Sequence, residues 1–273
     1  MALKPSENEK ALKRASTLTL PGLLALVLTG ATEVISTAAF VGSTVNYPVL
    51  AGLQPDLYRC FMEQTWGHST ARGIVTLVHP ESHFTDEKAG LLRSETYARL
   101  RRHWQFINEL TLYEVHHLVT FGVHVYGTPG RVDFLQAASL YHPDTVERSL
   151  RHDGSGSEPG FKDPDGHWDQ RPHAARILTV TDETLGLWHA ILEEALVPVR
   201  QTRMVYTVNR AVAEVLANLA HHERVGSMEL EFSRGWDESI DRKKGFFSTD
   251  WGLAASWRDV ILQGPHLHVA TPF

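Results

Sequence analysis

The chain has 273 residues, of which 42% are hydrophobic and 21% are charged, and its formal net charge is −6. This composition excludes a disordered chain and leaves room for one large domain or two modest ones. The negative charge excludes the bulk positive field of a strongly basic nucleic-acid-binding protein, although a local basic face stays open. Cys60 is the only cysteine, which excludes an internal disulfide and a cysteine-based zinc cluster and favours a reducing compartment.

Residues 1–45 are rich in Ala, Thr and Leu and predict one or two short helices. The apolar run Leu20–Leu28 is too short to cross a bilayer, and Glu33 interrupts its extension. Basic residues before the run outline a signal peptide, but Pro21 lies inside it and argues against that interpretation. We therefore predict a buried helix or an irregular segment here, no membrane association and a cytoplasmic protein.

The next segment, residues 46–152, has the clearest periodicity of the chain. Its order of helices and strands predicts an open α/β sheet with an antiparallel edge hairpin. The first strand is apolar without simple alternation, so we expect both of its faces to be covered. The predicted elements are a helix over 54–65, a strand over 73–79, a helix over 87–102, and a hairpin of strands over 106–113 and 119–126.

Glycines and prolines among polar residues make 153–173 a predicted loop or linker. Two helices are predicted after it, over 181–196, with Thr181 or Asp182 as the cap, and over 208–222. The predicted organisation is thus a helical or irregular segment (1–45), a first domain (46–152), a linker (153–173) and a mostly helical, loop-rich second region (174–273).

Sixteen histidines raise the question of a metal site. His79 and His83 are four residues apart, but Pro80 breaks the helix that would align them, and the other close histidines are mostly adjacent pairs that point apart. His266 and His268 could share one face of a strand, yet no HExxH-type motif accompanies them. We predict no metal site, and a histidine-dependent metal hydrolase remains an alternative.

Two basic clusters are either solvated surfaces or phosphate-contacting ones. The first lies on the helix predicted over 87–102, and the second lies among aromatic residues near position 243, where backbone contact and base stacking could combine. The candidate DNA-binding residues are Arg93, Arg101, Arg102, Arg242, Lys243 and Lys244.

An ordered set of segments resembles the large adenine-specific DNA methyltransferases of restriction and phage-defence systems. The resemblance covers the region that follows their catalytic loop and part of their recognition region. It implies a Rossmann-like methyltransferase sheet followed by a DNA-recognition domain, with S-adenosylmethionine as cofactor and double-stranded DNA as partner. The matching segments lie within 46–61, which ends in Asp56-Leu-Tyr-Arg-Cys-Phe61, within 73–84, which ends in His79-Pro-Glu-Ser-His-Phe84, and at His103-Trp-Gln-Phe-Ile-Asn-Glu-Leu110, Phe121-Gly-Val-His-Val-Tyr126 and 257–273.

The resemblance also implies roles for four residues. Phe61 would lie against the adenine of S-adenosylmethionine, with Asp56 and Tyr58 of the same helix beside it. Tyr113 would stack on the target adenine after it is flipped out of the duplex. For Phe61 and for Tyr113, a plain place in the core is the alternative.

The departures from this family are equally informative. The chain lacks the glycine-rich cofactor turn and the catalytic Pro-Pro loop, so we predict no catalytic residue and no activity without a partner chain that carries both motifs. The chain thus resembles a segment cut at both ends, and the strand at 73–78 is expected to expose an apolar edge that pairs with a partner or with a second copy. A non-enzymatic DNA-binding or interaction module is the alternative.

Overall fold

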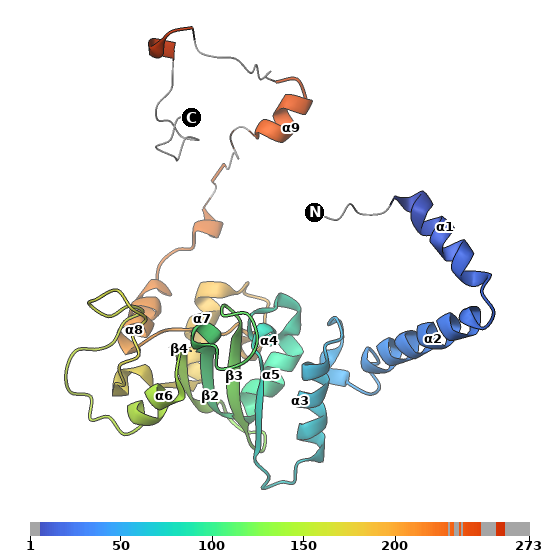
Figure 1. The fold of residues 1–273 in the computed structure, drawn as a ribbon. Helices are drawn as coiled ribbons and strands as arrows, with labels where there is room; N and C mark the ends of the chain where they lie inside the picture. Colours follow the sequence, from blue (N-terminus) through green and yellow to red (C-terminus); the bar gives the residue numbers. More distant parts are fainter. Residues whose placement is uncertain (1–5, 229, 232–234, 236, 247–254, 260–273) are drawn as a thin grey trace. The chain divides into compact units, whose positions relative to one another are not determined.

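The computed structural model describes residues 6–228, 230–231, 235, 237–246 and 255–259, and the chain divides into one unit up to Glu223 and another from Arg224 onward. The first unit contains the sheet (Figure 1). The helices are α1 (Glu7–Leu18), α2 (Leu23–Val41), α3 (Leu57–His68), α4 (Ser82–Thr85), α5 (Gly90–Arg99), α6 (Pro143–Ser149), α7 (Asp182–Leu192), α8 (Arg210–Leu219) and α9 (Glu238–Lys243). The strands are β1 (Val75–Pro80), β2 (Leu100–Ile107), β3 (Thr120–Tyr126), β4 (Asp133–Leu140) and β5 (Leu178–Thr181).

The five strands form one mixed sheet in the order β1-β3-β2-β4-β5. Strand β3 is antiparallel to both β1 and β2, β2 is parallel to β4, and β5 is antiparallel to β4. The predicted α/β class and the antiparallel pairing of the two hairpin strands are confirmed. The hairpin is not at an edge, however, because β3 lies between β1 and β2.

Strand β1 lies at the edge of the sheet, and within the part of the chain that the structure describes it pairs only with β3. Its side chains alternate between partly buried and exposed, and Val78 is 51% exposed. The expectation that both faces of this strand are covered is therefore wrong, whereas its predicted edge position is confirmed.

The strand predicted over 106–113 begins and ends earlier, as β2. The chain leaves the sheet at Asn108, a buried residue whose side-chain amide donates to the carbonyls of Tyr113 and Val115 and accepts from the Tyr113 amide. These bonds replace ladder partners with a local turn. The preceding helix accordingly ends at Arg99, before the first residue of β2.

Residues 174–223 belong to the first unit, which differs from the boundary predicted at 153–173. Strand β5 pairs with β4, and α7 follows it directly. The Thr181 hydroxyl accepts a hydrogen bond from the Thr184 amide, so the predicted cap of this helix is confirmed. Residues 153–173 contain no helix and only one isolated bridge, Lys162 to Trp168, in line with the predicted loop.

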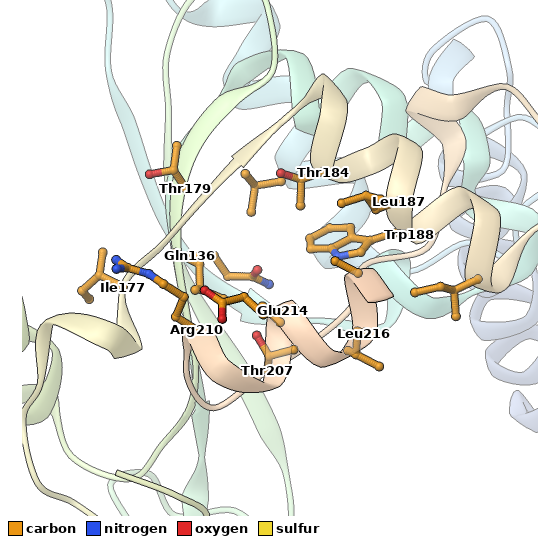
Figure 2. Close-up of a pocket in the computed structure, with 15 residues that line it drawn as sticks. Gln136, Ile177, Thr179, Thr184, Leu187, Trp188, Thr207, Arg210, Glu214 and Leu216 are labelled. Atoms are coloured by element: carbon orange, nitrogen blue, oxygen red, sulfur yellow. The ribbon is translucent and has the colours of Figure 1, made fainter. Parts of the chain in front are cut away.

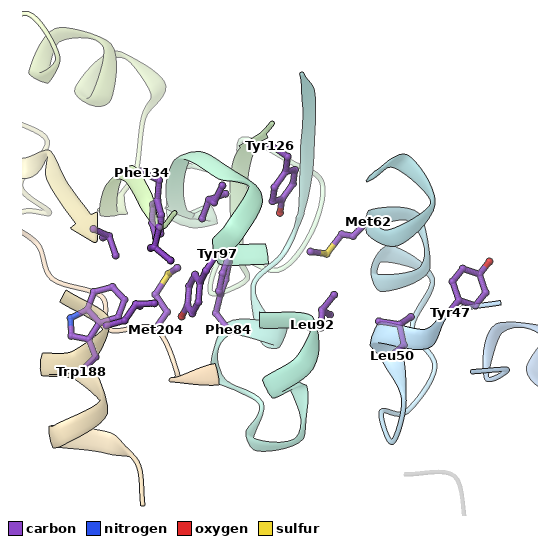
Figure 3. Packing of buried hydrophobic residues seen from close by; sticks show 14 of the residues in the cluster. Tyr47, Leu50, Met62, Phe84, Leu92, Tyr97, Tyr126, Phe134, Trp188 and Met204 are labelled. Atoms are coloured by element: carbon purple, nitrogen blue, oxygen red, sulfur yellow. The ribbon is translucent and has the colours of Figure 1, made fainter. Parts of the chain in front are cut away.

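The core lies on both faces of the sheet. On one face, side chains of α3, α5 and α7 pack over the strands, as in the run from Met62 through Leu92 and Tyr97 to Trp188 in Figure 3. On the other face a smaller cluster joins β2, β3, β4 and α6, with Phe106 as one of its members. Burial of apolar area on both faces stabilises the fold.

Helix α2 is mostly apolar, and none of its residues is buried. The prediction of a buried helix or irregular segment is wrong, because 23–41 forms a continuous, exposed helix of which only Val41, at its end, packs against the core. By length and composition alone this helix could cross a membrane, which is weak evidence for a helix so close to the N-terminus.

Candidate functional site

One row of residues across the sheet is polar although it faces the core. His124 of β3 stands opposite His103 of β2, and His103 stands opposite Gln136 of β4. All three side chains are buried. Since alternate residues of a strand share a face, this row lies on the face that also carries Tyr126, between apolar neighbours.

The carboxylate of Glu81 reaches this row from the loop after β1. Its Oε1 accepts hydrogen bonds from Nε2 of His103 (2.7 Å) and from Nε2 of His124 (3.0 Å). Both imidazoles are fully buried and Glu81 is nearly so. Burial opposes the charge of Glu81, but the two imidazoles outweigh burial and hold the pKa of this carboxyl well below its ordinary value.

Gly122 makes this approach possible. It faces the same side of β3 as His124, and a Cβ atom at this position would lie 2.1 Å from Oε1 of Glu81 and 2.2 Å from Cε1 of His124. Any other residue would push the carboxylate away from the imidazoles. A glycine inside a strand often marks such a close approach.

A second histidine network lies directly against the first. The ring of His79 stacks on that of His124 with centroids 3.9 Å apart. Its Nδ1 donates to the carbonyl of Pro80, so its Nε2 accepts from the hydroxyl of Tyr126 at 2.8 Å. Burial lowers the pKa of His79 to about 3, which keeps this ring neutral.

Two buried arginines hold the loop that carries Glu81. Arg59 of α3 pairs with Asp86 at 3.0 Å, while Arg93 of α5 donates to the carbonyls of His83 and Gln201. Through Arg93, helix α5 also fixes the segment that begins at Gln201 and contains Tyr206. Tyr206 lies beside the cluster. Burial and then the charge of Glu81 raise the pKa of its phenol well above the ordinary value.

The predicted cofactor residues of α3 have different surroundings. Phe61 is 63% exposed, so the alternative of a plain core residue does not hold for it. Asp56 caps the helix by accepting from the Tyr58 amide. The hydroxyl of Tyr58 hydrogen-bonds with Ser82, and its ring stacks on His79, so Tyr58 is part of the support around the buried cluster.

Tyr113, the predicted base-stacking residue, lies in the loop between β2 and β3. Its ring is half exposed and meets Phe121 edge-on at 4.8 Å, while its main chain is held by Asn108. A partly exposed ring on a fixed loop is open to a stacking partner, and it is not a core residue at a strand end.

The first predicted DNA-binding cluster does not form one surface. Arg93 is buried and its guanidinium donates to main-chain carbonyls, so it belongs to the core and not to a DNA-contacting face. Arg101 and Arg102 lie near the start of β2 and, with Arg72, line an open cavity of about 510 Å³. Tyr113 lies beyond the other end of the same strand, so the structure does not bring these predicted residues together.

The second predicted cluster lies in the unit from Arg224 onward. Arg242 and Lys243 form the last turn of α9, Lys244 follows as its C-terminal cap, and all three are exposed. His266, His268 and residues 260–273 of the last segment that resembles the methyltransferases lie outside the described residues.

A cavity of about 350 Å³ lies between the sheet, α7 and α8 (Figure 2). Trp188 and the polar residue Gln136 line it, and α8 contributes Arg210 and Glu214 at its side. The cavity is mainly apolar. Helix α8 forms one of its walls, and none of the residues of this helix is buried.

Among the described residues, Glu81, His103 and His124 form one group whose ligand atoms all lie within 4.8 Å of one another. The sequence prediction does not include them, because they come from β2, β3 and the loop after β1 and form no local metal motif. The available signal was Gly122 within the alternating run Phe121–Tyr126. The histidines whose spacing raises the question of a metal site in the sequence, such as His79 and His83, are not members of this group.

The comparisons with known proteins give no relative. No family model, no curated protein and no solved structure matches the chain.

Proposed function

We propose that the chain is the C-terminal portion of an S-adenosylmethionine-dependent, adenine-specific DNA methyltransferase. Its part would be to complete the cofactor pocket and to bind DNA in the cytoplasm. Methyl transfer would require a partner chain that carries the glycine-rich turn and the Pro-Pro loop, neither of which occurs in this sequence.

One observation carries this proposal. Three of the separate segments on which the family resemblance depends meet in space: His79 to Phe84, His103, and Gly122 to Tyr126 all contribute to the buried Glu81 cluster. Segments that resemble one family in sequence and also meet in the core support a common structural origin.

The edge of the sheet supports the need for a partner. Strand β1 has no neighbour on its outer side among the described residues, and Ile74 and Val78 beside it are exposed. Helix α3 adds Leu57 and Phe61, which are one turn apart and both exposed. An unpaired edge of this kind accepts a strand from another chain.

The fit to the cofactor is partial. The exposed ring of Phe61 could cover one face of a purine, whereas the contacts that a glycine-rich turn makes with the rest of the cofactor would come from the partner. When bound, S-adenosylmethionine would supply the electrophilic methyl group. The part assigned to this chain is to bind: Phe61 and Asp56 toward the cofactor, and Tyr113 toward the extruded adenine.

The alternative, a DNA-binding or interaction module without enzymatic activity, draws on the basic cavity of Arg72, Arg101 and Arg102. This cavity lies at the amino ends of β1 and β2 and at the carboxyl end of β3. DNA held there would be far from Tyr113.

The test is transfer of a labelled methyl group from S-adenosylmethionine to DNA. We expect no transfer by this chain alone and transfer when it is co-expressed with the product of the reading frame immediately upstream. Tyr113→Ala should reduce transfer by more than about tenfold, while Val115→Ala in the same exposed loop should not. A stable complex that binds DNA and transfers no methyl group would instead support the binding module.

A further inference from the structure

The structure assigns a binding site for a divalent transition-metal ion to Glu81, His103 and His124, a site that is independent of methyl transfer. Two imidazole nitrogens and one carboxylate oxygen form a common ligand set for zinc and for related ions.

The geometry is close to what such an ion requires. Ligands about 2.0–2.2 Å from zinc in a tetrahedral arrangement lie roughly 3.3 Å from one another. Nε2 of His103 and Nε2 of His124 lie 2.7 and 3.0 Å from Oε1 of Glu81, and all three atoms lie within 4.8 Å of one another. A shift of a few tenths of an ångström in the Glu81 side chain would lengthen its two distances to that value.

The ligands are also held in place before binding. His103 and His124 are directly opposite on neighbouring strands, so their backbone separation is fixed by the sheet. The Glu81 loop is held by Arg59 and Arg93, and Gly122 leaves the space into which the carboxylate extends. Sites on strands hold their ligands more precisely than sites on loops.

A second observation points to a missing occupant. The other carboxylate oxygen of Glu81, Oε2, is buried and has no hydrogen-bond partner among the described residues. The Tyr206 hydroxyl interacts with the same carboxylate but has no partner within ordinary hydrogen-bond distance. Since buried polar atoms are nearly always partnered, an ion bound by the carboxylate, with a water or the phenol beside it, would satisfy both.

The charge of the group suits a cation. A buried carboxylate with two imidazoles lacks a permanently charged partner at hydrogen-bond distance, since Arg59 and Arg93 bind other groups. A divalent cation would offset this negative charge in a region of low dielectric constant. Because the histidines are fully buried, a substrate would have no access, and the role would be to stabilise the sheet, not to hydrolyse a bound molecule.

The test uses the full chain, produced in zinc-supplemented medium and dialysed against metal-free buffer, with metal measured by inductively coupled plasma mass spectrometry. We expect about one zinc per chain, and visible d–d absorption bands when Co²⁺ replaces it. Glu81→Gln and His103→Gln should each weaken metal binding by more than about tenfold. His117→Gln is the matched control, because His117 also pairs with a glutamate, Glu109, but at the surface.

Zinc bound equally well by the variants would overturn the site, since sixteen histidines offer other positions. Because Glu81→Gln also removes two buried hydrogen bonds of the fold, a second measurement uses the unchanged protein. Removal of metal by a chelator should lower its thermal unfolding midpoint, and zinc alone should restore it. A folded wild-type chain that retains no metal, or whose midpoint is unchanged by the chelator, contradicts the proposal.

Discussion

Strands β2 and β3 show two faces that are stabilised in opposite ways. On one face Phe106 and Phe121 stack at 5.5 Å within an apolar cluster. On the other face, three residues away in sequence on each strand, His103 and His124 bind the carboxylate of Glu81. The apolar face depends on buried area, whereas the polar face depends on each group having its partner. On the first face the cost of a substitution should follow the apolar volume that it removes, and on the second it should follow the polar groups that it leaves without a partner.

The largest effect is expected on the apolar face. Phe106→Ala removes a buried ring and should lower the free energy of unfolding by about 3–5 kcal/mol, measured by urea titration. Leu118→Ala, at an exposed position in the loop between the same strands, should change it by no more than about 0.5 kcal/mol. Similar losses in both variants would show that Phe106 is not part of a packed core.

Asp169 differs from Glu81 in its partners, because it is a buried carboxylate beside arginines and not beside histidines. Asp169 is buried and accepts hydrogen bonds from Arg171, next to Arg176. Burial opposes its charge, but hydrogen bonds from Arg171 and from the Gly160 amide hold the pKa of Asp169 below its ordinary value. Asp169→Asn should cost about 3 kcal/mol, because the arginine charges remain without their partner.

The pH dependence of the Asp169 contribution follows from the sign of its shift. A lowered pKa in the folded state adds stability that is fully present above the unfolded value of 3.8 and is lost as the pH falls through the lower folded value. The wild type should therefore lose more stability than Asp169→Asn between about pH 5 and pH 2. Parallel curves for the two proteins would exclude this contribution.

On the polar face the sharpest probe is Gly122→Ala. The added methyl group would overlap Glu81 and His124, and we expect a loss of about 1–3 kcal/mol by urea titration. Gly186→Ala is the control, because a Cβ atom there meets nothing within 4 Å and α7 should gain about 0.5–1 kcal/mol from the better helix former. A neutral Gly122→Ala would mean that the carboxylate does not need this space.

The smallest effect on stability is expected at the sheet edge. Val78→Lys should change the free energy of unfolding by no more than about 0.5 kcal/mol, since the side chain is exposed. It should nevertheless reduce self-association, measured by analytical ultracentrifugation, because a lysine on an edge strand disfavours pairing with another chain. Unchanged association would show that copies of the chain do not meet through β1.

Elements with a signal in the local sequence could be predicted. Elements that depend on contacts with residues far away in the chain could not. Helix α7 was predictable from its cap at Thr181, and the edge strand β1 from its short apolar run before Pro80. Strand β4 was not predicted, because its alanines and leucines suit a helix equally well and only burial between β2 and β5 makes it a strand.

The same distinction applies to the candidate sites. Exposed residues such as Phe61 and Tyr113 could be selected from motifs along the chain. The Glu81 cluster could not, because its members come together only through the register of β1, β2 and β3. Arg93 was misassigned because a basic residue on an amphipathic helix gives no sign, in sequence, that main-chain carbonyls will surround it.

Hydrogen exchange at β1 tests the central claim most directly. Mass spectrometry would follow the peptide that covers Val75–Pro80, first in the chain alone and then in the complex with the product of the upstream reading frame. If a strand of that partner completes the sheet, the outward amides of β1 exchange rapidly in the isolated chain and become strongly protected in the complex. A complex that methylates DNA while β1 exchanges as before would contradict the account.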